Sequence, residues 1–294
     1  MDKFEAKAGF IAVVGRPNAG KSTLLNHLVG EKLAMVSKKV QATRQRMNII
    51  VEYDNSQQIY VDTPGIHERE KLLNRFMMEE VLKALGDCDL TLYLHPVHDD
   101  LQDYKKFLTY NKPHIVLITK IDEVSQEKLL KKISEFTPFQ DRFIDLIPTS
   151  VNKQVGKDQI LKSVKKQLPS SPYLFDSDAI TTSTIRQIYK ELIREAIFEK
   201  LSDELPYESD VTIEKIDESD EIDRVYASII VEKPSQKGMV IGRGGESIKR
   251  IGATARAKLT NFSGKRIYLD LMVVVKKGWT KQKETLADVG YILD

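Results

Sequence analysis

The chain has one cysteine, Cys88, and no apolar run long enough to cross a bilayer. A single cysteine excludes an internal disulfide framework and a zinc site built from cysteines, and it favours a reducing cytosol. The N-terminal stretch MDKFEAKAGFIAVVG leads directly into a glycine loop, so we do not interpret it as a signal peptide. The 294 residues, 41% of them hydrophobic and 30% charged, fit one large or two ordinary globular domains.

Net charge is also small, at +2, but the charges are unevenly distributed. Residues 203–223 carry ten acidic side chains and one basic one, whereas residues 235–281 carry eleven basic and two acidic ones. Such an asymmetry indicates either a face built for a polyanion or ordinary clustering on a solvated surface. Charge alone leaves both interpretations open.

The first 170 residues alternate apolar strand patterns with helical patterns. Several of the strand patterns are continuous apolar runs, which is typical of strands buried on both faces. We therefore expect an α/β fold with a mixed, mostly parallel sheet and helices on both faces. The expected strands are residues 9–15, 47–53, 57–63, 90–96, 114–120 and 142–150.

A stretch without periodicity, LPSSPYLFDSDAITTST at residues 168–184, separates this region from a second one. We predict a first domain at 1–170, a linker at 171–183 and a smaller α+β domain at 184–294. In the second domain the patterns predict helices at 184–201 and 245–262 and strands at 209–217, 223–233 and 265–277.

GRPNAGKS at residues 15–22 matches G-x-x-x-x-G-K-[ST], the P-loop that binds nucleotide phosphates. Gly15 and Gly20 let backbone amides converge on phosphate oxygens, and Lys21 reaches the β- and γ-phosphates. Ser22 offers its hydroxyl to Mg²⁺. We assign nucleotide binding to Gly15, Arg16, Pro17, Asn18, Ala19, Gly20, Lys21, Ser22 and Thr23.

Three later stretches, each at the end of an expected strand, indicate which nucleotide base the site binds. In DTPG (62–65), Asp62 is placed to hold Mg²⁺ through water and the Gly65 amide to sense the γ-phosphate. In TKID (119–122), the Asp122 carboxylate can accept from guanine N1–H and N2–H₂ together, and adenine lacks that donor pair. In TSV (149–151), backbone amides can reach guanine O6. The added nucleotide-binding residues are Asp62, Thr63, Pro64, Gly65, Thr119, Lys120, Asp122, Ser150 and Val151.

With these boxes in this order, the first domain resembles the translation-factor-class GTPases. The resemblance implies that KVQATRQR (39–46) is a switch, with Thr43 joining Ser22 and Asp62 as the Mg²⁺ ligands. Three residues depart from the family boxes: Ala42 replaces a threonine, Thr119 an asparagine and Val151 an alanine. Base contacts at Val151 are mainly through the backbone, so we expect guanine specificity to survive.

The residue after DTPG is Ile66, where many GTPases carry a glutamine that orients water, so we expect slow intrinsic hydrolysis. We interpret His67 as an exposed loop residue. An asparagine at position 18 is found in GTPases that use K⁺, but asparagine also suits a tight turn, and both explanations remain open. The expected catalytic residues are Lys21, Thr43, Gly65 and Asn18.

In the second domain, MVIGRGGESIKRIG (239–252) contains a GxxG loop between two helices. Such a loop with basic neighbours is typical of a KH domain that clamps single-stranded RNA. Trp279, the only tryptophan, either stacks on a base or completes the core. The expected RNA-binding residues are Ile241, Gly242, Arg243, Gly244, Gly245, Lys249 and Arg250.

The whole combination, together with ELPYES and the ending VKKGWTKQKETLADVGYI, resembles the Era family of bacterial GTPases. That resemblance implies GTP and GDP as ligands, and the 3′ end of 16S ribosomal RNA and the 30S subunit as partners. It also implies a cytoplasmic monomer with peripheral inner-membrane association. Nucleotide state then controls RNA binding through switches near 38–46 and 65–75, and the domains reorient about residues 168–184.

Three alternatives remain at this point. In the first, the protein is a static RNA-binding module in which the nucleotide is only structural. In the second, the P-loop belongs to a small-molecule phosphotransferase. In the third, the protein is a GTPase whose KH fold binds protein. The phosphotransferase alternative leaves TKID and the GxxG loop unexplained.

Overall fold

The computed structural model describes residues 6–35, 43–65, 72–202, 204–289 and 291. The chain forms two compact units, one made mainly of residues 1–182 and the other mainly of residues 183–294. Each unit has its own sheet and its own apolar core.

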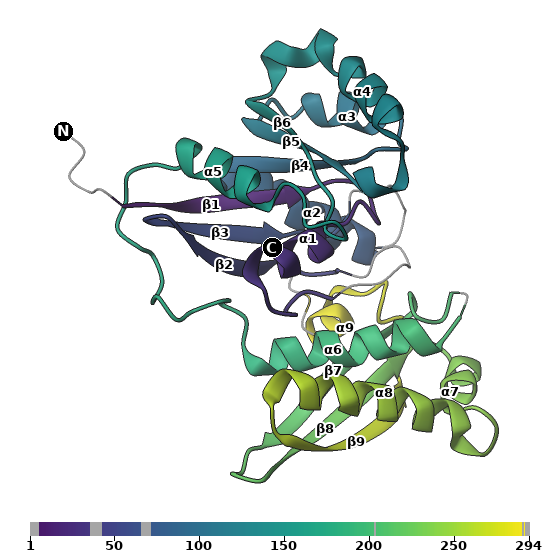
Figure 1. Ribbon diagram of the computed structural model, residues 1–294. Coiled ribbons are helices and arrows are strands. Elements are labelled where there is room, and N and C mark those ends of the chain that lie inside the picture. The colour runs from purple at the N-terminus through teal and green to yellow at the C-terminus, as the bar shows by residue number, and fades with distance from the viewer. Residues whose placement is uncertain (1–5, 36–42, 66–71, 203, 290, 292–294) are drawn as a thin grey trace. The chain divides into compact units, whose positions relative to one another are not determined.

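In the described part of the first unit, six strands form one sheet in the order β2-β3-β1-β4-β5-β6 (Figure 1). Strand β2 is antiparallel to β3, and the other neighbouring pairs are parallel. Strands β4 and β5 are buried at every residue, as continuous apolar runs between two helical layers should be. The expected mixed, mostly parallel sheet is confirmed. Its strands are β1 Lys7–Val14, β2 Met47–Tyr53, β3 Ser56–Asp62, β4 Leu90–Pro96, β5 His114–Thr119 and β6 Asp145–Pro148.

Helices cover both faces of this sheet. On one face, Ala12 and Val14 of β1 lie in an apolar cluster with Tyr93, Tyr104 and Phe107. On the other face, α1 and α5 line a groove together with β2. The described helices of this unit are α1 Lys21–Val29, α2 Leu72–Asp87, α3 Gln102–Leu108, α4 Gln126–Glu135 and α5 Lys157–Gln167, with short 3₁₀ turns η1 Ile121–Glu123 and η2 Thr137–Arg142.

The parallel topology brings the four sequence boxes to one edge of the sheet. The P-loop follows β1, DTPG follows β3, TKID follows β5 and TSV follows β6. Because parallel strands present their carboxyl ends at the same edge, these loops meet where ligands bind in open α/β sheets.

The second unit has a three-stranded sheet, β7-β8-β9, with α6 and α8 on one face (Figure 1). Strands β7 and β8 are antiparallel, as expected, and β9 is parallel to β8. Helix α6 begins with a capping box between Thr184 and Gln187, which satisfies amides of its first turn. The elements are α6 Ile185–Lys200, β7 Ser209–Asp217, β8 Ile222–Val231, α7 Pro234–Ile241, η3 Arg243–Gly245, α8 Glu246–Ser263, β9 Arg266–Val275 and α9 Lys283–Ala287.

The segment after β9 belongs to the core of this unit. Trp279 has no exposed surface, and its Nε1 donates to the Glu208 carbonyl oxygen at 3.3 Å. The explanation that Trp279 stacks on a base is therefore wrong for this structure. Further along, the Tyr291 hydroxyl donates to the fully buried Asp210 carboxylate, which also pairs with the buried Arg194 at 3.3 Å. The chain end thus closes a buried ionic cluster.

The predicted linker is fixed to the first unit over most of its length. We call residues 170–181 the strap. Ser170 pairs with Lys7, and Thr181 pairs with Ile49 in an antiparallel bridge. The sequence gives no periodicity here because the strap is held by backbone groups and by one buried glutamine, Gln57. The strap lies against the sheet in this structure, and reorientation of the domains about residues 168–184 stays a prediction.

No helix in the described ranges is both long enough and apolar enough to cross a membrane.

Candidate nucleotide and RNA sites

The P-loop has the backbone conformation that its glycines predict. Gly15 has a φ of 155°, and a Cβ there would lie 2.7 Å from the Leu94 carbonyl oxygen. Gly20 has a φ of 98° and precedes the first residue of α1, so the helix presents its amides to the loop. Asn18 is exposed and has a φ of 62°, a left-handed conformation that asparagine tolerates. The turn explanation of Asn18 therefore has direct geometric support.

Lys21 lies beneath this loop with 7% of its surface exposed. Its ammonium group donates to the carbonyl oxygens of Gly15 at 3.1 Å and Arg16 at 3.2 Å. Burial lowers the pKa of Lys21 to about 8, and the nearby Asp62 carboxylate opposes part of that shift. The loop thus holds a cation whose pKa is lowered by burial, so that the ammonium form predominates at neutral pH and part of it is lost in mildly alkaline solution.

Nucleotide binding should therefore take up a proton at Lys21 in mildly alkaline solution. Phosphate oxygens favour the ammonium form, so binding raises the lysine pKa from about 8. At pH 8.5 we expect an uptake of roughly 0.7 proton per nucleotide, and at pH 7 almost none. Titration calorimetry with GDP, in two buffers of different ionisation enthalpy, measures this number. Equal heats in both buffers at pH 8.5 contradict the expectation.

Three oxygen-bearing side chains converge beside Lys21. Ser22 Oγ donates to Asp62 Oδ2 at 2.9 Å, and Thr43 Oγ1 lies 3.3 Å from the same oxygen. The two hydroxyl oxygens are 3.2 Å apart. Hydroxyl and carboxylate oxygens are the ligands Mg²⁺ prefers, and Mg²⁺ also keeps several waters. The cluster fits Mg²⁺ held by Ser22 and Thr43, with Asp62 acting directly or through water.

The DTPG loop lies against the P-loop. Thr63 Oγ1 donates to the Val13 carbonyl oxygen at 2.7 Å, next to the end of β1. A Cβ at Gly65 would lie 2.8 Å from the Pro17 backbone nitrogen, so only glycine fits this approach. The Gly65 amide is therefore held next to the loop that takes the phosphates. Ile66 and His67 lie outside the described residues, as do Ala42 and the larger part of both expected switches.

Asp122 is set up as a hydrogen-bond acceptor by two residues of the loop after β6. Ser150 Oγ donates to Asp122 Oδ1 at 2.6 Å, and Asn152 Nδ2 donates to Oδ2 at 2.9 Å. The Ser150 hydrogen bond, followed by that of Asn152, holds the pKa of Asp122 below its usual value. The sequence analysis missed Asn152. Its only signal was an amide side chain one residue beyond the TSV box.

The unusual Thr119 has a specific task. Its hydroxyl donates to the Ala19 carbonyl oxygen at 2.9 Å, and the side chain is buried. The threonine therefore connects the TKID stretch (119–122) to the P-loop through this hydrogen bond. Lys120 follows in the left-handed region with a φ of 61°, and Val151 begins a turn with the Gln154 amide bonded to its carbonyl oxygen at 3.1 Å.

Arg16 contributes its backbone to the P-loop but directs its side chain elsewhere. The guanidinium group is paired with the Asp99 carboxylate, after the end of β4, through two hydrogen bonds. Lys132 also donates to the Asp99 carbonyl oxygen, at 2.6 Å. This pairing fixes the outer side of the P-loop to the body of the unit.

The GxxG loop of the second unit is a sharp connection between α7 and α8. Gly242, Gly244 and Gly245 all have positive φ, at 74°, 58° and 78°. A Cβ at Gly242 would lie 2.7 Å from the Ser247 Cβ, whereas one at Gly244 meets nothing within 4 Å. The tip of the loop is thus open to a close approach by another backbone. Arg243, Gly244, Lys249 and Arg250 are exposed, and Ile241 and Gly245 are half-buried.

Buried polar contacts hold α7, which carries this loop. Gln236 Oε1 accepts from the backbone amides of Glu232 and Lys233 at 2.9 and 2.8 Å. Among the other basic residues, Lys258 turns away from the loop and pairs with Glu195 and Glu199 on α6. Lys258 is therefore engaged within the unit, whereas Arg243, Lys249 and Arg250 are exposed at or near the GxxG tip.

Comparisons with known proteins cover both units. A family model described as "50S ribosome-binding GTPase" matches residues 10–120, and a KH domain model matches residues 192–280. GTPase Era of Helicobacter pylori (strain G27) is 47% identical to the chain over 294 residues and is covered to 98%, as is this chain. GTPase Era of Campylobacter concisus (strain 13826) is 45% identical over 288 residues, covering 97% of this chain and 100% of that protein.

Two solved structures also match nearly the whole chain. The crystal structure of Era in complex with MgGDPNP and nucleotides 1506–1542 of 16S ribosomal RNA matches with a TM-score of 0.92 and 32% identity, covering 98% of this chain and 100% of that one. Aquifex aeolicus Era bound to GDP.AlF4- matches with the same TM-score, identity and coverage. Relatives this similar extend over nearly the whole chain and both of its units, so the chain belongs to the Era family of GTPases.

Proposed function

We propose that this GTPase binds the 3′ end of 16S ribosomal RNA through its KH domain and assists assembly of the small ribosomal subunit. We also propose that the bound nucleotide controls the affinity for RNA. One observation carries the proposal: a carboxylate held as a hydrogen-bond acceptor, Asp122, and an open GxxG tip flanked by cations occur in one chain. A relative of 32% identity is crystallised with both kinds of ligand.

In the nucleotide site, each residue has a defined task. The P-loop amides and Lys21 hold the β- and γ-phosphates, and Asp122 accepts from the guanine edge. Ser22 and Thr43 would hold Mg²⁺ directly, and the ion would supply positive charge that offsets the negative charge of the phosphates. The Gly65 amide senses the γ-phosphate. The contacts that hold Thr43 and Gly65 in place are therefore lost once the γ-phosphate leaves.

Hydrolysis should depend on the monovalent cation if Asn18 has a catalytic task. The exposed Asn18 side chain belongs to the loop that surrounds the phosphates, and an amide oxygen there can ligate K⁺, whose charge then offsets the negative charge of the transition state. We expect GTP turnover about tenfold faster in KCl than in NaCl at equal ionic strength. Asn18→Gly keeps the left-handed turn and should abolish the difference. Equal turnover in the two salts would contradict a catalytic role for Asn18 and leave only its role in the turn.

The nucleotide dependence of RNA binding is tested directly by affinity. A single-stranded oligonucleotide with the sequence of the 16S ribosomal RNA 3′ end is titrated with the protein bound to Mg²⁺ and GDPNP, and then to Mg²⁺ and GDP. We expect tighter binding in the GDPNP state, by a factor of about five or more, a typical size for coupling between sites. Equal affinities reject nucleotide control, and no binding in either state rejects the RNA proposal.

The remaining partners follow from the same proposal. The 30S subunit carries the RNA target, and the protein acts as a cytoplasmic monomer that associates peripherally with the inner membrane. Sedimentation of the purified protein with isolated 30S subunits, and separately with lipid vesicles, checks the two associations.

A further inference from the structure

Beyond its start, where Ser170 pairs with Lys7, the strap touches the first unit at two further places. At the first, the buried Gln57 side chain of β3 binds the strap backbone. Its Oε1 accepts from the amides of Leu174 and Phe175 at 2.8 and 3.0 Å, and its Nε2 donates to the Phe175 carbonyl oxygen at 2.8 Å. The Phe175 ring also meets the Phe10 ring edge to face, with 6.4 Å between centroids. This anchor combines a fully satisfied buried amide with aromatic packing.

The second place, which we call the latch, lies on the outer edge of β2. The Ile50 amide donates to the Ile180 carbonyl oxygen at 2.9 Å, and Thr181 Oγ1 donates to the Asn48 carbonyl oxygen at 2.6 Å. Ile180 remains 40% exposed, so little apolar surface supports these bonds. The latch is therefore the weaker of the two contacts.

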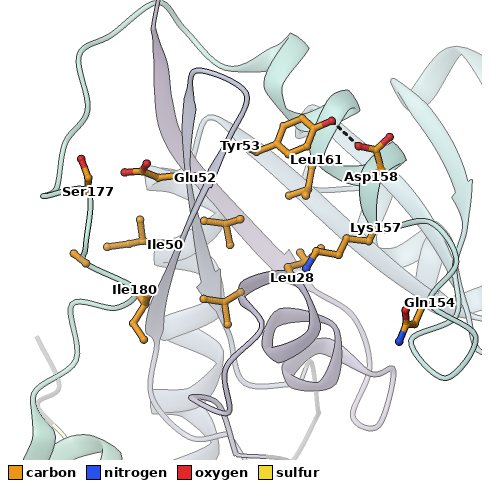
Figure 2. Close-up of a pocket in the computed structure, with 13 residues that line it drawn as sticks. Leu28, Ile50, Glu52, Tyr53, Gln154, Lys157, Asp158, Leu161, Ser177 and Ile180 are labelled. Atoms are coloured by element: carbon orange, nitrogen blue, oxygen red, sulfur yellow. Dashed lines mark hydrogen bonds between the residues drawn. The ribbon is translucent and has the colours of Figure 1, made fainter.

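A hollow of about 550 Å³ lies beside the latch (Figure 2). Ser177, Ala179 and Ile180 of the strap line it on one side, and Leu28 and Leu161 are among the residues on the other. The strap borders this hollow along residues 177–180, so this part of the strap does not pack on a filled surface. If the latch opens, residues 176–179 have few contacts to lose, while the Gln57 anchor still holds the strap.

In the pairing of β2 with β3, the latch also lies next to the residues that we expect to bind Mg²⁺. Met47 of β2 pairs with Asp62 of β3, and the latch begins at the next residue, Asn48. Thr43, five positions from Asn48 along the chain, lies 3.3 Å from the Asp62 carboxylate. A displacement of Thr43 after loss of the γ-phosphate therefore acts on a short backbone segment that leads directly into the latch.

We propose that the β2–strap latch is the nucleotide-sensitive contact that sets the pivot of the RNA-binding unit. With Thr43 docked beside Asp62, as in this structure, the latch is closed and the chain pivots at residues 182–183, just before the Thr184 cap of α6. With GDP the latch opens, and the pivot moves back to residues 176–179. The inference rests on the proposed nucleotide control of RNA binding.

Hydrogen exchange of single amides tests the latch without RNA. The Ile50 amide should exchange at least about tenfold faster with Mg²⁺ and GDP than with Mg²⁺ and GDPNP, because its acceptor on the strap is lost when the latch opens. The Leu174 amide, bound to Gln57, is the internal control and should exchange at one rate in both states. Equal protection of Ile50 in the two states overturns the inference.

Two neighbouring threonines provide a matched pair for the RNA measurement. Thr181→Val removes the hydroxyl that donates to Asn48 and keeps the branched shape. Thr182→Val makes the same change at the neighbouring exposed threonine, which lies at the pivot and not in the latch, and keeps the β-branched backbone preference there. We expect Thr181→Val to weaken RNA binding in the GDPNP state about fivefold, toward the GDP value, and Thr182→Val to leave it unchanged. GTP hydrolysis without RNA should be the same in both variants.

The outcomes separate the two proposals. If the wild-type protein distinguishes GDPNP from GDP in RNA affinity but Thr181→Val behaves like Thr182→Val, nucleotide control stands and the latch does not carry it. If the wild-type affinities are equal, nucleotide control itself fails and the inference fails with it.

Discussion

Replacement of Asp122 by asparagine is expected to exchange the preferred base from guanine to xanthine. The Asp122 carboxylate can accept from guanine N1–H and N2–H₂ together, whereas an asparagine amide offers one acceptor and one donor. Xanthine, with an N1–H beside a C2 carbonyl, matches that pair. Each charge-assisted hydrogen bond contributes about 1.5–3 kcal/mol, so GDP affinity should fall about a hundredfold or more. Competition of GDP and XDP for the purified variant measures the exchange.

Asn152→Ala is the matched control for this experiment. It removes the donor at 2.9 Å from Asp122 but leaves the carboxylate in place. GDP affinity should fall only about three- to tenfold, and guanine should still be preferred over xanthine. A loss of GDP binding in Asn152→Ala as large as in Asp122→Asn, or an Asp122→Asn variant that keeps its GDP affinity, contradicts this account of base selection.

Acidic substitutions at the GxxG tip are expected to abolish RNA binding while sparing the GTPase. Gly244 has a φ of 58° and free space around its missing Cβ, and aspartate tolerates that conformation. Arg243→Asp with Gly244→Asp replaces one cation by two anions where a nucleic-acid backbone approaches. We expect the affinity for the ribosomal RNA oligonucleotide to fall about a hundredfold or more at moderate salt.

Three measurements keep this result interpretable. GTP turnover without RNA should be unchanged, because the substitutions lie in the other unit. The thermal transition of the KH domain should fall by only a few degrees, since a Cβ at Gly244 meets nothing within 4 Å and only the positive φ disfavours aspartate there. Lys131→Asp on α4, an exposed charge change of the same sign outside the KH domain, should not affect RNA binding. RNA affinity unchanged in the double variant excludes the GxxG tip as the binding surface.

The sequence predicted the sheet well because each strand is an apolar run, and the four sequence boxes come to one edge of it because each follows a strand. It did not predict Asn152, because a single polar side chain in a loop shows no partner until the fold places Asp122 beside it. It suggested only a loose linker at 171–183, because backbone bonds and a distant glutamine, Gln57, hold that segment without any local pattern. Trp279 remained ambiguous because one aromatic residue after a strand fits both a core and a stacking surface.

The buried cluster around Asp210 has a practical consequence for dissecting the protein. Tyr291 reaches it from the last described part of the chain, although the KH model match ends at residue 280. A fragment cut at 280 would delete this hydroxyl and leave the buried Asp210 carboxylate without one of its hydrogen-bond donors, and a hydrogen bond to a charged group contributes about 1.5–3 kcal/mol. Expression boundaries for an isolated RNA-binding module should therefore extend past residue 291, and purification tags are better placed at the opposite terminus.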